Sequence, residues 1–122
     1  MSAVAASWWL RRAHEWRALA DATLRAVRAP AGSRAPLLIA LGGVAKQAKD
    51  VPFPVEGESA AFWSGVLLNG ARTYAAAPAD LQSRVGPAVE QVALVCLSLI
   101  EAEHAAACRR ANQRITGERD DD

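Results

Sequence analysis

The residues best suited to chemistry lie near the end of the chain, where Glu101, Glu103, His104 and Cys108 fall within eight positions. Glu101 and His104 have the E-x-x-H spacing that places a carboxylate and an imidazole on neighbouring helical turns, as in ferritin-like metal sites. Such a centre needs a matching ligand set on a second helix, and the only other histidine, His14, falls on the polar side of an earlier helix. His104 and Cys108 could supply two zinc ligands, but no further donors are evident. We therefore expect no metal and no cofactor, and interpret the carboxylates as surface or interhelical ion-pair residues.

Other catalytic signatures are missing from the sequence. It contains no Gly-rich phosphate loop, C-x-x-C, H-x-x-x-H or G-x-S-x-G motif. The stretch from Glu90 to His104 resembles the helical core of the AhpD-like alkylhydroperoxidase and carboxymuconolactone decarboxylase group. The redox members of that group have two cysteines one turn apart upstream of a histidine, whereas here Cys96 stands alone. We therefore expect a protein that is not an enzyme and has no catalytic residues.

An aromatic residue beside arginines marks the beginning of the chain as a candidate binding surface. On a helical wheel Trp8 points about 100° away from Trp9, on the side of Arg12. An aromatic beside arginine is a common interface anchor, and it can also stack on a base while the arginine contacts a phosphate. Trp8 could equally be a partly buried flank of the helix. The predicted partner-binding residues are Trp8, Arg11 and Arg12, together with Glu103, Arg110 and Arg114 in the last helix.

Charge is unevenly distributed along the chain. Residues 1–50 hold eight Lys/Arg and three Asp/Glu, a net of +5, and residues 51–122 hold six and ten, a net of −4. The basic first half either packs along the acidic last helix or faces a different partner. We favour packing, because a bundle of this size brings its first and last helices together.

Apolar periodicity predicts four helices separated by turns that contain Pro or Gly. We expect them at about residues 7–28, 36–49, 59–77 and 87–115, with a short helical turn at 80–85 before the chain restarts at Gly86-Pro87. The fold class is therefore all-α, a four-helix bundle, up-down or a close variant, with a long C-terminal helix. It forms a single domain over residues 1–122, with an ordered core at about 7–115 and a flexible acidic tail at 116–122.

Side chains at spacings of three and four define the expected core-facing stripes. The stripe of the last helix turns from apolar to charged after about Ile100, so it either leaves the core there or meets charged partners. Trp16, Leu41, Val66 and Ile100 lie on the most strongly patterned faces and are the predicted core.

The two cysteines, Cys96 and Cys108, would lie roughly 18 Å apart along one helix, beyond the reach of a disulfide. A reducing cytoplasm is the simplest location. No segment approaches about 18 uninterrupted apolar residues, so we expect no membrane span.

The leading functional prediction is a small adaptor, inhibitor or subunit that binds a larger protein or associates with itself. The alternative comes from a resemblance. An Arg-rich first helix, a turn and the run A-P-L-L-I-A-L-G-G-V-A at 35–45 are similar to the small all-helical subunits of CRISPR effector complexes. That resemblance implies a nucleic-acid-associated subunit that uses the basic first helix, with arginines 11, 12, 17, 25 and 28.

Overall fold

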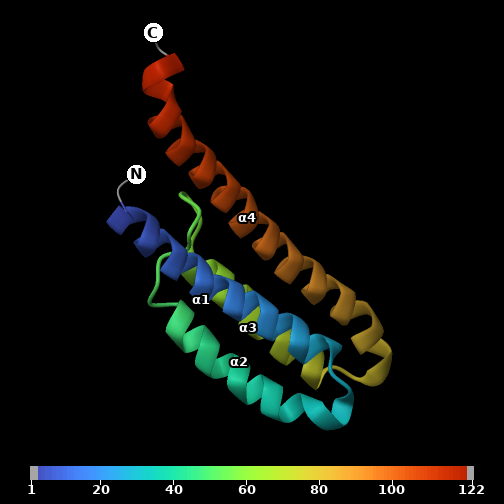
Figure 1. The fold of residues 1–122 in the computed structure, drawn as a ribbon. Helices are drawn as coiled ribbons and strands as arrows, with labels where there is room; N and C mark the ends of the chain where they lie inside the picture. The colour runs from blue at the N-terminus through green and yellow to red at the C-terminus, as the bar shows by residue number, and fades with distance from the viewer. Residues whose placement is uncertain (1–2, 121–122) are drawn as a thin grey trace.

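The structure is a computed structural model that describes residues 3–120, with side chains described for residues 10–113. Over this range the chain forms four α-helices and no strand. They are α1 (Ala3–Arg28), α2 (Arg34–Ala48), α3 (Ala60–Ala76) and α4 (Ala79–Asp120), with a short 3-10 helix at Ala31–Ser33. Helices that follow one another in the chain run in opposite directions (Figure 1). The prediction of an all-α bundle with a long C-terminal helix is confirmed.

Helices α1 and α3 each pack against all three other helices, and α1 makes the more extensive contacts. Over the described residues α2 and α4 do not touch and occupy opposite corners of the bundle. The buried face of α1 is a stripe of residues at spacings of three and four, whereas residues on the other side, such as His14 and Arg25, are exposed. The buried members of the stripe are Ala13, Trp16, Ala20, Leu24 and Val27.

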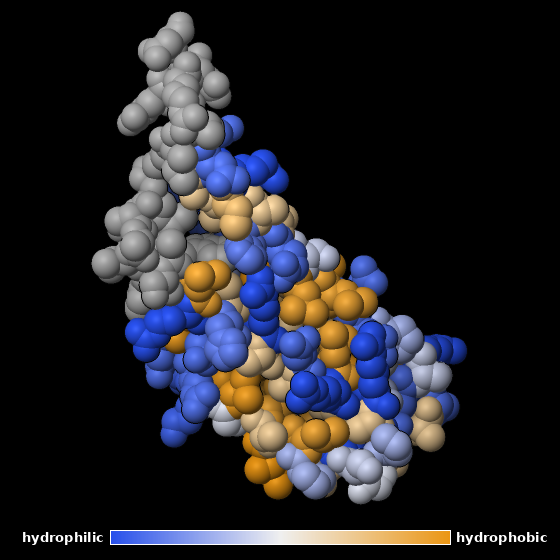
Figure 2. All heavy atoms as spheres, in the orientation of Figure 1, coloured by the Kyte–Doolittle hydropathy of each residue, from blue (hydrophilic) through white to orange (hydrophobic). Residues whose placement is uncertain are grey.

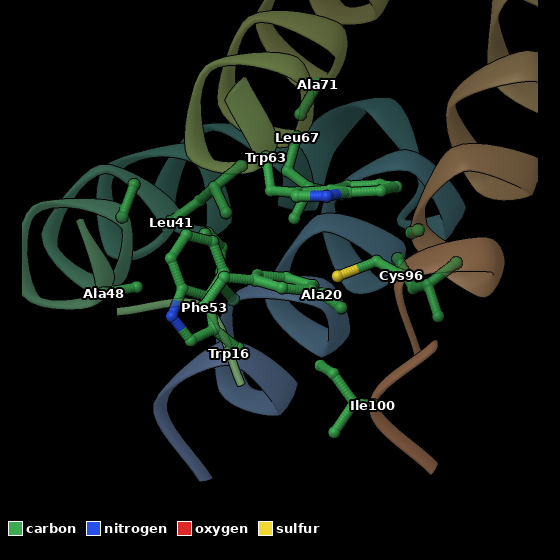
Figure 3. Close-up of a cluster of buried hydrophobic side chains, with 14 of the residues drawn as sticks. Trp16, Ala20, Leu41, Ala48, Phe53, Trp63, Leu67, Ala71, Cys96 and Ile100 are labelled. Atoms are coloured by element: carbon green, nitrogen blue, oxygen red, sulfur yellow. The ribbon is translucent and has the colours of Figure 1, made fainter. Parts of the chain in front are cut away.

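Three of the four predicted core residues are fully buried, and the fourth is not. Trp16, Leu41 and Ile100 have no exposed surface (Figure 3). Val66 is only partly buried, so its assignment to the core was wrong. Helix α3 has apolar residues on two adjacent lines. Val66 lies on one of these lines, and the line that faces the core is the other one, which holds Trp63, Leu67 and Ala71.

Helix α4 starts earlier than predicted. The chain does not restart at Gly86-Pro87: one continuous helix begins at Ala79 and contains Pro87. Proline has no N–H and removes one backbone hydrogen bond, but this loss does not end the helix. A Cβ at Gly86 would lie 3.0 Å from the Tyr74 ring, so this glycine permits a close approach of α3 and α4 rather than a break. The helix continues through residues 116–120 of the predicted tail, and residues 121–122 lie outside the described part.

The α2–α3 loop, residues 49–59, closes one end of the core. Phe53 is 3% exposed, and its ring lies edge-on to Trp16 at 5.0 Å between centroids. Arg12 donates from Nε to the carbonyl of Pro52 at 3.1 Å and from Nη2 to the carbonyl of Phe53 at 2.6 Å. The Trp16 indole donates to the carbonyl of Val51 at 3.0 Å. Side chains of α1 therefore hold the backbone of the loop in place.

Candidate partner-binding surfaces

Arg17 of α1 connects to two residues of α4 that the sequence marked as candidate ligands. Its Nη2 lies 2.7 Å from Glu101 Oε1 and 3.1 Å from His104 Nδ1. A guanidinium can only donate, so His104 Nδ1 accepts this bond and carries no proton in this arrangement. Glu101 is thus an interhelical ion-pair residue, as predicted. Within the described residues no group of three or more His, Cys, Asp or Glu side chains could hold a metal ion.

A second ion pair joins the same two helices at the other end of the bundle, where Arg28 Nε lies 3.5 Å from Glu90 Oε1. Both pairs join a basic residue of α1 to an acidic residue of α4, so the first helix does pack along the last one. The four side chains are about a third to two-thirds exposed. Each pair is therefore worth at most about 1 kcal/mol.

The core-facing stripe of α4 does not leave the core directly after Ile100, but its charged residue meets a charged partner. Ala107 is still buried at 4% exposure, so the helix remains packed for two further turns. Glu103 meets a charged partner from its own helix, because Arg110 Nη2 lies 2.7 Å from Glu103 Oε1. That pair lies at the surface, with Arg110 56% exposed.

The predicted partner-binding residues do not form a single surface in the described part of the chain. Arg11 is exposed, whereas Arg12 is bound to the α2–α3 loop. Glu103 and Arg110 pair with one another on α4. The side chains of Trp8 and Arg114 lie outside the described residues.

A different apolar surface lies on the outer side of α3 and α4. Phe62 is 56% exposed, and Leu94 and Val95 are each 40% exposed. Gly70 lies close to Val89 and Gly86 close to Tyr74, which sets the antiparallel register of α3 and α4 at this end. Counted along both helices, that register makes Phe62 level with the turn of α4 that holds Ser98. We call this surface the α3–α4 face and define it as Phe62, Leu94, Val95, Ser98 and Ala102.

One outward stripe of α4 runs through the α3–α4 face and carries no charge, although the exposed Glu101 borders it. Its exposed residues follow one another at spacings of three and four, the spacing of one helical face. They are Pro87, Gln91, Leu94, Ser98, Ala102 and Ala105, all exposed and all uncharged.

The sequence itself contains a signal for this face. Residues 92–97 are apolar all round the helix, and one helix cannot bury every side in a four-helix bundle. In the structure the buried side of this stretch is Ala93 and Cys96, which leaves Leu94 and Val95 outside.

A groove between α1 and α2 is a second candidate surface. It encloses about 430 Å³ over an apolar floor that includes Ala18, Leu37 and Val44. Arg17, Asp21 and Arg25 also line it. Figure 2 shows this side of the molecule, with charged groups along α1 and hydrophobic atoms over α2 and beside the middle of α4.

Cys96 lies on the buried side of α4, where burial raises the pKa of its thiol to about 12. The nucleophilic form of cysteine is the thiolate, so this thiol is inert near neutral pH. Cys108 is exposed, and both cysteines are free.

Part of α4 meets the length and composition expected of a membrane span. The segment Ala79–Gln113 is long and apolar enough, and 28% of its most apolar stretch is buried inside the bundle. Core helices of soluble proteins can satisfy the same criterion. The absence of a membrane span therefore stays a prediction.

Comparison of the chain with protein-family models, curated proteins and solved structures gave no match. The functional argument therefore rests on the surfaces described above.

Proposed function

We propose that this protein is a non-enzymatic binding module that docks on a protein partner through the α3–α4 face. The observation that supports this most directly is the exposure of the apolar side chains of Phe62, Leu94 and Val95 on α3 and α4. Clustered exposed apolar side chains mark interaction sites, and an aromatic residue such as Phe62 supplies a large contact area. These side chains are not required for the core, because Cys96 and Ile100 already occupy the side of α4 that faces it.

Action by binding rather than catalysis fits the reactive groups that the structure describes. Cys96 is a buried neutral thiol, and His104 Nδ1 already accepts a hydrogen bond from Arg17. Two free cysteines are compatible with a reducing cytoplasm, which we propose as the location.

The alternative, a nucleic-acid-associated subunit, has less support from the contacts of α1. Phosphate affinity depends on clustered lysine and arginine charges that are not already neutralised. Of the five arginines proposed for that role, Arg17 and Arg28 pair with glutamates of α4, and Arg12 holds the α2–α3 loop. Arg11 and Arg25 are left as the exposed members without an ion pair in the described part.

Affinity capture with matched variants tests the proposal. The immobilised full chain would be exposed to an extract of its host cells and compared with Phe62→Glu and Leu94→Lys variants. The control is Ile39→Lys, because Ile39 is 79% exposed but lies on α2, away from the α3–α4 face. We expect both face variants to lose the captured protein and the control to retain it. Equal capture by all four chains, each checked for native helicity by circular dichroism, would reject the proposal.

A further inference from the structure

We infer that the groove between α1 and α2, which we call the α1–α2 groove, receives an acidic amphipathic helix of a partner protein. This inference goes beyond the proposed function, because the groove shares no residue with the α3–α4 face. It gives the protein a second docking surface, on the other two helices of the bundle.

The α1–α2 groove is long enough to hold a helix. Its first part encloses about 430 Å³, and a second hollow of about 550 Å³ shares Asp21, Arg25 and Leu37 with it. Along α1 the two parts together extend from His14 to Ala29, a rise of about 22 Å. That length matches about four turns of helix. The docking of an amphipathic helix in an apolar groove is a recurring form of peptide recognition.

Small side chains form the floor of the groove. Ala18 and Ala22 lie one turn apart on α1, and Ala40 lines the groove from α2. Leu37 and Val44, one turn before and one turn after Ala40, are partly buried and extend the apolar lining. Alanines leave room for larger apolar side chains of a second helix, which present themselves at positions i, i+3, i+4 and i+7. The floor therefore fits the apolar face of an amphipathic partner.

Charge determines the polar face of that partner. Among the described residues, three arginines, Arg17, Arg25 and Arg28, line the groove against one acidic residue, Asp21. Residues 10–48, which form both walls, carry seven Lys/Arg and two Asp/Glu. Two further negative charges come from the glutamates of α4 that pair with Arg17 and Arg28, which leaves a net charge of +3. This sign is complementary to an acidic helix.

Two neighbouring arginines can bind carboxylates of the partner. Arg25 is exposed, lines both parts of the groove and has no ion pair in the described part of the chain. Arg28, one turn later, contacts Glu90 Oε1 through Nε at 3.5 Å. A guanidinium has five N–H groups, so the outer nitrogens of Arg28 can donate to a further acceptor. Arginine binds carboxylates with defined geometry, which favours glutamate or aspartate side chains on the docked helix.

Fluorescence anisotropy on the full chain tests the inference with three labelled peptides of about 15 residues, the length of the groove. The first peptide has leucines at i, i+3, i+4 and i+7, and glutamate and alanine at the other positions. In the second, lysines replace the glutamates. The third has the composition of the first, with its leucines distributed around the helix. We expect saturable binding of the first peptide alone.

Matched variants of the chain locate the binding site. Arg25→Glu should weaken binding of the first peptide at least about tenfold, because like charges placed opposite one another oppose association. The control Arg109→Glu makes the same change of charge at an exposed position of α4. It should alter the affinity by less than about twofold, because salt screens charges that lie far from the groove. Phe62→Ala, on the α3–α4 face, should bind like the unmodified chain, and circular dichroism should show native helicity in all variants.

Four outcomes would overturn the inference. The first is no saturable binding of the first peptide below about millimolar concentration. The second is equal binding of the lysine peptide or of the peptide with distributed leucines, because neither charge nor apolar pattern would then be recognised. The third is binding lost in Phe62→Ala and retained in Arg25→Glu, which would place the peptide on the α3–α4 face. The fourth is binding of a single-stranded DNA in place of the acidic peptide, which would assign the groove to nucleic acid.

Discussion

Phe53 stacks on Trp63, with ring centroids 5.5 Å apart and ring planes inclined by 14°, although Phe53 belongs to a loop and Trp63 to the first turns of α3. The Trp63 indole in turn donates to Glu58 Oε2 of the same loop at 2.9 Å. The aromatic core of the bundle is therefore completed by a segment without regular structure, and its stability depends on that segment staying in place.

Replacing Phe53 with alanine is expected to lower the free energy of unfolding by about 3 to 5 kcal/mol, because it leaves a cavity between Trp16 and Trp63. Phe62→Ala is the matched control, since that ring is 56% exposed, and it should cost far less. Urea denaturation followed by circular dichroism measures both values. Similar losses in the two variants would mean that the loop does not complete the core.

Arg12 should stabilise the loop more than its neighbour Arg11 does. Arg12→Met removes two hydrogen bonds from a charged donor to the carbonyls of Pro52 and Phe53, each of a kind worth about 1.5 to 3 kcal/mol. Arg11→Met removes no such bond. Hydrogen exchange of the amides in residues 49–59 should accelerate in the Arg12 variant only. Equal exchange in both variants would show that Arg12 does not hold the loop in place.

The two cysteines should differ in reactivity. In the native protein at pH 8 we expect a thiol reagent to modify one cysteine per chain, Cys108, because burial raises the pKa of Cys96 to about 12. The second thiol should react only after unfolding in urea. The Cys108→Ser variant serves as control and should be inert until unfolded, so its rapid modification in the folded state would contradict the burial of Cys96.

The same raised pKa predicts a loss of stability at alkaline pH. The folded-state pKa of Cys96 is about 12 against a model value of 9.0, so the folded protein holds this proton more tightly than the unfolded chain. The contribution of Cys96 is therefore fully present below about pH 9 and declines as the pH rises toward 12. Cys96→Ala should show a smaller decline over that window in urea titrations, and an identical decline would exclude Cys96 as its source.

Nucleic-acid binding by the isolated protein should be weak and only shallowly dependent on salt. In the described part of the chain, Arg11 and Arg25 are the arginines of α1 that have no ion pair. The slope of log K against log salt should therefore not exceed about 2 in magnitude. Fluorescence anisotropy with a generic DNA or RNA between low and moderate salt measures it. A much steeper slope, abolished by Arg11→Glu with Arg25→Glu, would favour the nucleic-acid alternative.

The helices with one dominant apolar stripe were predictable from sequence. Helix α1 buries the stripe that its spacing defines, including Trp16 and Leu24, because the residues on the opposite side, such as Arg11 and Asp21, cannot be buried unpaired. The pairing of α1 with the acidic residues of α4 followed from the charge distribution by the same reasoning.

Features that depend on packing between helices were not predictable in this way. By local preference Gly86 and Pro87 indicate a break in the helix. In the bundle α4 continues through both residues, and Gly86 lies against the Tyr74 ring. Helix α3 offers two apolar lines, and only the positions of its neighbours select Trp63 over Val66. The α3–α4 face was missed because an apolar helix looks equally buried on all sides until its neighbours are known.

The place of α4 in the chain has a consequence for synthesis. Ala93, Cys96 and Ile100 complete the core, yet they leave the ribosome after all of α1, α2 and α3. Until then, the side of α1 that lies against α4, where Arg17 and Arg28 pair with glutamates of α4, has no cover within its own chain. During synthesis the protein therefore passes through a three-helix intermediate with exposed hydrophobic surface, which is prone to aggregation. Docking of α4 covers that surface.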